Sequence, residues 1–170
     1  TYFPSHQYVL YTPSLKNRIE LPYEDKVTLV SQDPALPSVF SSWWRSFHIT
    51  RRIRHDKLSL FHGLSNELPF GMHRSGVPSV VTIHDLIFLQ YPELYKITDV
   101  LIYKAKFSSA CRNANAIIAV SRQTADDIVR YFSVPPEKVH VVYQSCNPLF
   151  AMKISSEDQQ RIKEKYRLPS

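Results

Sequence analysis

Short apolar runs rich in β-branched residues recur along the chain, and each is predicted to be a β-strand. Most of these runs are continuous rather than alternating, which is typical of parallel strands buried on both faces by helices. The runs cover residues 8–11, 27–30, 58–61, 80–83, 116–120 and 139–143.

Helical patterns lie between several of the predicted strands. Residues 122–132 carry apolar side chains at spacings of three and four, with Ser121 placed as the N-cap and Val134-Pro135-Pro136 placed to end the helix. Residues 97–112 form a second helical pattern. One face of it is expected to carry Ile97, Leu101, Ala105, Ser108 and Cys111.

The alternation of strands and helices predicts an α/β fold. We expect a Rossmann-like, doubly wound, mostly parallel sheet with helices on both faces. Residues 151–170 differ in character, because Ser155-Ser156-Glu157-Asp158 begins a polar helix over 159–166 that resembles a linker.

The composition excludes some classes of function but does not identify one. With 170 residues the chain is long enough for one well-buried domain, and its net charge of +6 favours anionic partners or simply a solvated basic surface. Only 3 glycines occur, and neither G-x-G-x-x-G nor G-x-x-x-x-G-K-[ST] is present, which argues against a phosphate-binding loop of either kind.

Residues 41–57 form the most basic and aromatic segment. As a helix, this segment would place Trp43, Phe47 and Ile53 near one side, with arginines elsewhere. It would suit phosphate, nucleic acid or lipid headgroups, or else be a crossover helix with its arginines in water. The shortness of the basic run favours the crossover helix.

Polar residues follow four of the predicted strands at the point where each strand ends. The carboxyl ends of parallel strands share one edge of a sheet, where ligands of open α/β folds bind. Singly, each residue has an ordinary structural explanation, but together they predict a cleft for hydroxyl-rich or anionic ligands. They are His62, Asn66 and Glu67, then His84 and Asp85, then Ser121 and Arg122, and finally Gln144.

Other chemistries fit the sequence less well. His62, His73 and His84 lack the spacing of a metal site, so we expect no metal and no cofactor. A serine hydrolase is disfavoured because no G-x-S-x-G elbow is present. Cys111 and Cys146 are expected to be free thiols.

Four motifs in order resemble the N-terminal half of a retaining, family-four glycosyltransferase with the GT-B fold. They are L-F-H-G-L-S-N-E-L-P (60–69), V-V-T-I-H-D-L-I-F-L-Q-Y-P (80–92), N-A-N-A-I-I-A-V-S-R-Q-T-A-D-D-I (113–128) and K-V-H-V-V-Y-Q-S-C-N-P-L-F (138–150). Such enzymes hold the acceptor mainly in the N-terminal domain and the nucleotide-sugar donor mainly in the C-terminal domain.

The resemblance implies roles for the polar residues of the predicted edge. His84 would lie near the donor sugar and the reacting carbon, and Asp85 would support the loop or contact sugar hydroxyls. His62, Asn66, Glu67, Ser121, Arg122 and Gln144 would line the acceptor side. The implied partners are a nucleotide-sugar donor, a glycan or lipid-linked acceptor and an anionic membrane surface. The implied location is the cytoplasm, and no nucleic-acid partner is expected.

The sequence also departs from the family pattern. Arg122 stands where the family commonly has Glu, and Ser145 where it usually has Gly. We expect residues 1–150 to be the acceptor-side domain without its first strand and glycine-rich loop, and 151–170 to lead to an absent donor domain. The chain alone would then be inactive. A non-catalytic binding module and a nucleic-acid-binding domain using 41–57 remain as alternatives.

Overall fold

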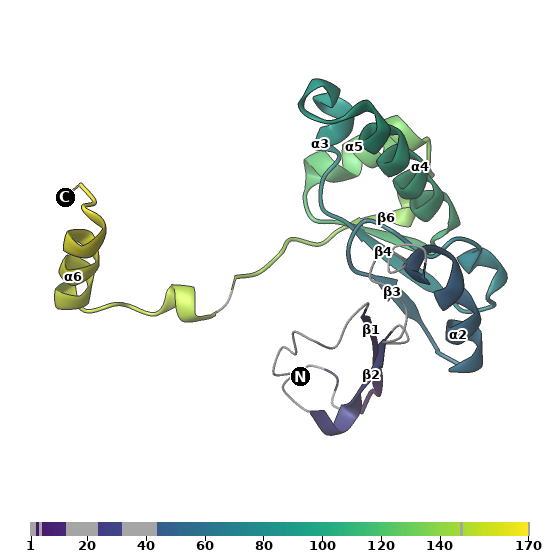
Figure 1. The fold of residues 1–170 in the computed structure, drawn as a ribbon, viewed down its shortest axis with the longest axis horizontal. Coiled ribbons are helices and arrows are strands. Elements are labelled where there is room, and N and C mark those ends of the chain that lie inside the picture. Colours follow the sequence, from purple (N-terminus) through teal and green to yellow (C-terminus); the bar gives the residue numbers. More distant parts are fainter. Residues whose placement is uncertain (1–2, 4, 13–23, 32–43, 147, 170) are drawn as a thin grey trace.

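The computed structural model describes residues 3, 5–12, 24–31, 44–146 and 148–169, and it has the α/β architecture that the sequence predicts (Figure 1). Every strand in this part of the chain runs parallel to its neighbour. The strands are β1 (Tyr8–Thr12), β2 (Val27–Ser31), β3 (Phe61–Gly63), β4 (Ser79–Ile83), β5 (Ala116–Ala119) and β6 (Val139–Val141). The Rossmann-like α/β prediction is therefore confirmed.

Five α-helices and several short turns connect these strands in the described ranges. The helices are α2 (Ile49–His55), α3 (Ile87–Gln90), α4 (Ile97–Asn113), α5 (Arg122–Phe132) and α6 (Ser156–Tyr166). A π-helical turn, η3 (Trp44–His48), precedes α2. The 3₁₀ turns are η1 (Glu24–Lys26), η4 (Met72–Arg74), η5 (Pro92–Leu94), η6 (Pro136–Lys138) and η7 (Pro148–Ala151).

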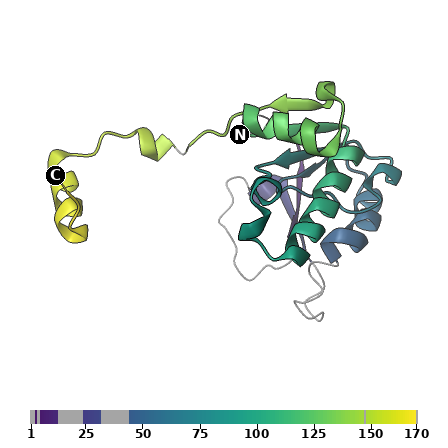
Figure 2. The same ribbon diagram turned by 90° about the horizontal axis from the view of Figure 1, so that it is seen from above.

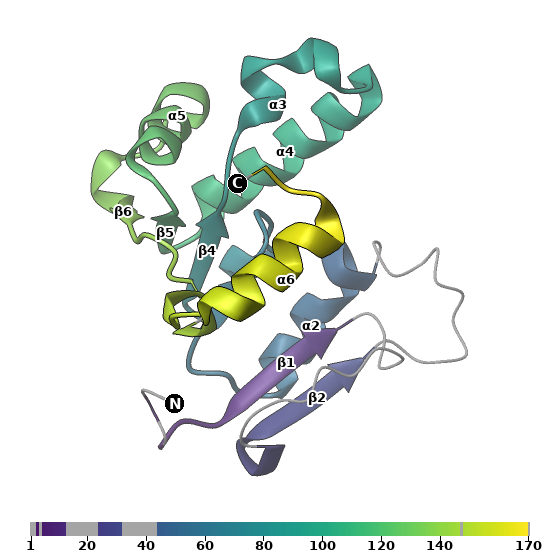
Figure 3. The ribbon, with the colours of Figure 1, turned by 90° about the vertical axis from the view of Figure 1, so that its left-hand side faces the viewer.

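The described strands form two separate hydrogen-bonded sheets, a division that the sequence pattern did not predict. One sheet has the order β1-β2 and the other the order β3-β4-β5-β6. Figure 1 shows the β1-β2 pair beside β3, and Figure 3 shows β1, β2 and β4 running in the same general direction. We therefore describe the two sheets as parts of one layer of parallel strands.

The core lies where α5 packs on the middle of the four-stranded sheet. Val81 and Ile117, paired across β4 and β5, are both fully buried, as is Ile128 of α5. The alternating buried and half-buried positions of β4 show that helices and loops cover it. Figure 2 shows α4 and α5 lying along the sheet.

Helix α5 begins and ends where the sequence predicts. The Ser121 hydroxyl accepts a hydrogen bond from the Thr124 N–H at 3.0 Å, which satisfies one of the free amides of the first turn. Ser133 adopts the left-handed conformation, with φ of 51°, and its N–H bonds to Val129 O. The apolar and charged positions of this helix are therefore fixed relative to the sheet edge.

The predicted face of α4 is only partly confirmed, because its N-terminal residues are exposed while its last residue, Cys111, is buried. Ile97 and Leu101 are 79% and 64% exposed, whereas Ala110 and Cys111 are buried. The first half of α4 packs against α3 through Phe88, whose ring lies edge-on to Tyr103 and to Phe107. In this half of α4, the side chains that face α3 are therefore Tyr103 and Phe107, and not Ile97 and Leu101.

The basic segment is not one regular helix. It is divided into η3 and α2, with Trp44 and Ile53 buried. Phe47 is 54% exposed and stacks on Phe70, so its predicted place beside Ile53 is wrong. Trp43 lies outside the described residues.

Tyr11 of β1 is tied to the end of α2 by a short hydrogen bond. Its hydroxyl donates to Asp56 Oδ2 at 2.7 Å, and Arg52 Nε donates to Asp56 Oδ1 at 2.9 Å. Burial and the bond to Asp56 raise the pKa of Tyr11 above its ordinary value. Burial alone would raise the pKa of Asp56, but the bonds from Tyr11, Arg52 and His55 outweigh it and lower that pKa.

The Tyr11–Asp56 contact predicts an acid-sensitive part of the stability. A carboxyl whose pKa is lowered on folding stabilises the protein above its unfolded value of about 3.9, and this contribution disappears as the pH falls through the folded value. We expect Tyr11→Phe to lower the free energy of unfolding by about 0.5–1.5 kcal/mol at pH 7, measured by urea denaturation. In an Asp56→Asn background, or at a pH well below the lowered pKa of Asp56, the same substitution should have a much smaller effect. An unchanged effect in that background would contradict the coupling.

Helix α6 stands apart from the sheets. Figures 1 and 2 show it at the end of an extended segment that follows β6. Its N-cap is Ser155, which accepts from Asp158 N–H, so the predicted polar helix is confirmed with its start at Ser156. Across the described ranges, no helix combines the length and apolarity needed to cross a bilayer.

Candidate functional site

The candidate site lies at the carboxyl ends of the four-stranded sheet, where the loops after β3, β4, β5 and β6 meet. His84 directly follows β4 and occupies the middle of this edge. Contacts from the loops after β3 and β6 and from the first turn of α5 converge on it. The parallel register brings these segments together although they are far apart in the sequence.

The imidazole of His84 is held on both nitrogens. Nε2 lies 2.9 Å from Leu64 O, and Nδ1 lies 3.4 Å from Gln144 Nε2. A carbonyl oxygen only accepts hydrogen bonds, so Nε2 carries the proton. In the neutral ring, Nδ1 is then left with a lone pair that accepts from the Gln144 amide. The ring is half-buried and oriented from two loops.

The backbone of His84 is fixed as well. Its N–H donates to Asn66 Oδ1 at 2.7 Å, and its carbonyl oxygen accepts from Thr124 Oγ1 at 3.1 Å. Thr124 belongs to the first turn of α5, so this bond joins β4 to the helix that follows β5. The sequence analysis did not predict a role for Thr124, because its position in a helix does not indicate a contact with the end of β4.

Asn66 holds the loop after β3 against the end of β4. It adopts the left-handed conformation, with φ of 62°, which asparagine tolerates better than most residues. Its N–H donates to Thr82 O at 2.9 Å while its side chain accepts from His84 N–H. Asn66 is therefore a positioning residue for His84 in this structure.

Gly63 lets this loop turn back closely on the strand. A Cβ added there would lie 2.3 Å from Glu67 O and 2.9 Å from Leu68 Cδ2. A distance of 2.3 Å to a backbone atom cannot be accommodated without a shift of the loop. The return of the chain at Asn66 and Glu67 therefore depends on the missing side chain.

His62 lies within β3 rather than after it, because the strand covers 61–63 instead of the predicted 58–61. Its Nε2 lies 2.8 Å from Thr82 Oγ1 on the neighbouring strand. Partial burial lowers the pKa of His62, so the ring is neutral at pH 7. The strand begins late because Phe61 N–H bonds to Pro78 O and sets the register with β4.

The remaining predicted site residues differ in whether they contact His84. The Asp85 carboxylate accepts from Ile87 N–H at 3.2 Å and supports the start of α3, yet it remains exposed. The Ser121 hydroxyl is engaged in capping α5, and Arg122 is exposed on the first turn. Gln144 reaches His84 directly. The structure thus brings His84, Asn66 and Gln144 into one network and leaves Arg122 outside it.

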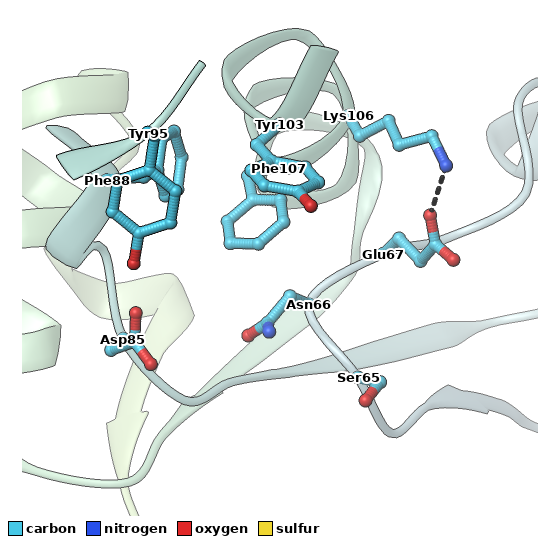
Figure 4. Close-up of a pocket in the computed structure, with 9 residues that line it drawn as sticks. All are labelled: Ser65, Asn66, Glu67, Asp85, Phe88, Tyr95, Tyr103, Lys106 and Phe107. Carbon is cyan, nitrogen blue, oxygen red and sulfur yellow. Dashed lines mark hydrogen bonds and ion pairs between the residues drawn. The ribbon is translucent and has the colours of Figure 1, made fainter. Parts of the chain in front are cut away.

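A pocket of about 340 Å³ opens beside this network, between α4 and the loops after β3 and β4 (Figure 4). Aromatic rings stand on one side of it, and the side chains of Asn66, Asp85 and Ser65 stand opposite. Lys106 Nζ pairs with Glu67 Oε2 at 2.8 Å along its edge. The aromatic residues are Phe88, Tyr95, Tyr103 and Phe107.

These aromatic residues and Lys106 were missed by sequence reasoning. The spacing of Tyr103 and Phe107 by four places them on one helical face, and this signal was available. It was outweighed by the face of Ile97 and Leu101, which the structure shows to be exposed. A face that combines aromatic rings with carboxylate and amide groups suits a ligand with both apolar faces and hydroxyl groups.

Other candidate chemistry finds no support in the described residues. No group of three or more His, Cys, Asp or Glu side chains there is arranged to hold a metal ion. Cys111 and Cys146 are both free thiols, and burial raises the pKa of Cys111 to about 12, which makes it a poor nucleophile.

The arginines of α2 face solvent, as a crossover helix requires. Arg52 pairs with Asp56 and Arg54 donates to Arg74 O, while Arg51 is exposed. Two of these three guanidinium groups are therefore engaged within the chain.

One family model matches the chain. It is described as Glycosyltransferase Family 4, and the match covers residues 5–148. A comparison with curated proteins found no match.

Proposed function

Because the chain belongs to glycosyltransferase family 4, we propose that residues 1–150 are the acceptor-side domain of an enzyme that moves a sugar from a nucleotide-sugar donor to a glycan or lipid-linked acceptor. The observation that carries this proposal is the oriented imidazole of His84 beside the aromatic pocket. Both lie at the sheet edge where open α/β folds bind ligands. A non-catalytic module with the same fold would keep these hydrogen bonds, so the transfer assay below distinguishes the two functions.

In the proposed reaction, His84 stabilises developing positive charge and does not act as a general base. Transfer breaks the bond between the anomeric carbon and the diphosphate oxygen and forms a bond to the acceptor oxygen. Positive charge develops at the anomeric carbon as the first bond breaks. A neutral imidazole that is oriented in advance, as His84 is, would stabilise that charge through its fixed dipole without having to reorganise. We propose retention of the anomeric configuration, in keeping with the resemblance.

The aromatic pocket is the proposed binding site of the acceptor sugar. A pyranose ring has apolar C–H faces, which pack on aromatic rings, and hydroxyl groups around its edge, which bond to carboxylates and amides. Tyr103 and Phe107 supply the apolar wall, and Asn66 and Asp85 supply hydrogen-bond partners opposite (Figure 4). The Glu67–Lys106 ion pair would then bound the pocket on its polar side.

The remaining roles complete the proposal. His62 and Gln144 line the same edge, and Ser121 and Arg122 lie beside it. The polar helix α6 would lead towards a second domain that binds the nucleotide of the donor. Exposed basic residues such as Arg51 would lie towards an anionic membrane that carries the acceptor, and the protein would work at the inner face of that membrane in the cytoplasm.

The direct test is transfer by the full-length protein encoded by the gene. Purified protein should be incubated with a panel of labelled nucleotide sugars and with glycan and lipid-linked acceptors. The expected result is product formation with one donor, with the anomeric configuration determined by NMR. The absence of transfer across the panel, together with no saccharide binding by the pocket, would favour the non-catalytic module.

If the pocket binds the acceptor, Tyr103→Ala should weaken acceptor binding selectively. Loss of a stacking partner worth about 0.5–1.5 kcal/mol should raise the acceptor KM by roughly 2–13-fold and leave the donor KM nearly unchanged. Tyr103→Phe retains the ring and should retain most of the acceptor affinity. Tyr166→Ala is the control, because Tyr166 is 61% exposed on α6, away from the pocket. Equal changes in both KM values would contradict the assignment.

A further inference from the structure

We propose that Asp127 of α5 is a positioning residue for the aromatic pocket, and that it acts through Gln90 at the end of α3. The Gln90 Nε2 amide donates to Asp127 Oδ2 at 2.6 Å. We call this bond the Gln90–Asp127 tether, because it joins the segment after β4 to the helix after β5. The inference rests on the proposed binding of an acceptor at the pocket, since acceptor affinity is the functional quantity that the tether would control.

Asp127 is a buried carboxylate that is held by neutral groups. It is 4% exposed, and besides Gln90 it accepts from Gln123 Nε2 at 3.1 Å. Within the described ranges it takes part in no ion pair. An ionised carboxylate is costly to bury unless hydrogen bonds replace its water, and its oxygens can only accept. Asp127 therefore requires N–H donors from both glutamines, and this requirement fixes the orientation of the Gln90 side chain.

Helix α3 needs support from outside itself. It has four residues, whereas isolated helices shorter than about 12 residues are marginal, and Leu86 at its N-cap makes no side-chain capping bond. Leu86 and Phe88 are buried and hold the segment on the core. Apolar burial is non-directional, whereas a hydrogen bond is directional. The tether thus supplies the directional contact at the last residue of α3.

Helix α5 holds the segment 84–90 at both of its ends. Thr124 Oγ1 donates to His84 O at 3.1 Å, and Asp127 accepts from Gln90. Thr124 and Asp127 are three residues apart, which places them on one face of α5, and both are buried. One face of a single helix therefore sets the position of α3 relative to His84.

Phe88 is the residue through which α3 forms part of the pocket. Its ring centroid lies 5.7 Å from that of Tyr103 and 5.1 Å from that of Phe107, edge-on in both cases, and all three rings line the pocket (Figure 4). Loss of the tether would let α3 rotate and would move Phe88 relative to the other two rings. The acceptor would then bind less tightly, while binding of the donor would not depend on the tether.

Two substitutions break the tether at its exposed end. Gln90→Glu keeps the size of the side chain but sets a carboxylate against the Asp127 carboxylate, and Gln90→Ala removes the donor. Because Gln90 is exposed, both variants should remain folded, which a melting curve checks. In the full-length protein encoded by the gene, we expect either variant to raise the acceptor KM at least about two-fold and to leave the donor KM unchanged.

The same variants have a readout that does not require transfer. The Tyr91 N–H bonds to Ile87 O at 2.8 Å and reports on the opening of α3. Its hydrogen exchange should become at least about ten-fold faster when the tether is broken. Nuclear Overhauser effects between the rings of Phe88 and Tyr103 should weaken in parallel, because the ring contact depends on the orientation of α3.

An exchange of donor and acceptor tests whether the bond itself is responsible. When Asp127→Asn is added to Gln90→Glu, the new amide can donate to the new carboxylate, and its oxygen can still accept from Gln123. This double variant should recover the slow exchange and the low acceptor KM. Asp126→Asn in the Gln90→Glu background is the matched control. It removes the same charge from the exposed neighbouring residue of α5 and should restore neither quantity.

The outcomes separate this proposal from the proposed function. An unchanged acceptor KM in both tether variants would overturn the proposal, even if α3 exchanged faster, because Asp127 would then serve stability alone. Failure of Asp127→Asn to restore the Gln90→Glu variant, or equal restoration by Asp126→Asn, would also overturn it. Absence of transfer by the unmodified protein would instead contradict the proposed function. In that case unaltered exchange of Tyr91 and unaltered ring contacts of Phe88 would still overturn the positioning role.

Discussion

On the proposed function, replacement of His84 by alanine in the protein encoded by the gene is expected to lower kcat by about 10²–10³-fold. The reason is electrostatic. The ring is held in place before the reaction by Leu64 O and Gln144 Nε2, so its dipole is already oriented when charge develops. Removal of such a preorganised group affects the transition state more than the ground state, and the acceptor KM should change little.

The same substitution should cost little stability. The ring makes a hydrogen bond to Leu64 O and a longer one to Gln144, and each typical bond contributes about 1 kcal/mol. The backbone bonds to Asn66 and Thr124 remain in the variant. A melting curve close to that of the unmodified protein, combined with slow transfer, would separate a role in catalysis from a role in folding.

His140→Ala is the matched control for this experiment. His140 is an exposed histidine on β6, paired in register with Ile118, and none of its described contacts involves the His84 network. Its loss should change neither kcat nor the melting temperature. If His84→Ala retained full turnover, His84 would have no place in the site.

Gly63→Ala is expected to impair both folding and function. The new methyl group would meet Glu67 O at 2.3 Å, so the loop that carries Asn66 and Glu67 must move. Crowding of this kind costs about 1–3 kcal/mol, measured by urea denaturation of the 170-residue chain. The shift would also displace Asn66 from His84 N–H, so transfer by the full-length protein should fall even at temperatures where the variant is folded.

Gly76→Ala separates the local effect at Gly63 from a general loss of stability. Gly76 has φ of 75°, and a Cβ added there meets no atom within 4 Å. Alanine at this position should cost about 1–2 kcal/mol through backbone strain alone. Transfer measured well below the melting temperature should be unaffected, whereas the Gly63 variant should stay slow. Equal activity of the two variants would show that the loop tolerates the shift.

The apolar pattern predicted the strands well because burial of a strand in a parallel sheet demands a continuous apolar run. Residues 80–83 and 116–120 correspond closely to β4 and β5, and both strands are central in the four-stranded sheet. The prediction was weaker for β3, which starts three residues late. Its register is set by Pro78 and β4, which are distant in sequence.

The composition of the site could be predicted only in part. His84 and Gln144 follow apolar runs, so their place at the sheet edge could be inferred from the parallel arrangement. The aromatic wall could not be assigned in the same way, because Tyr103 and Phe107 face the pocket only through the packing of Phe88 on α4. Sequence periodicity gives the faces of a helix but does not say which face meets a neighbour.

The sequence by itself determined the α/β class, the start and end of α5 and the strands that carry the polar residues, because these depend on local burial patterns and on capping groups close in sequence. Only the tertiary structure decided which polar groups meet, which face of α4 is buried and where the sheet is divided. Those outcomes depend on contacts between segments far apart along the chain, whose energies no local pattern encodes.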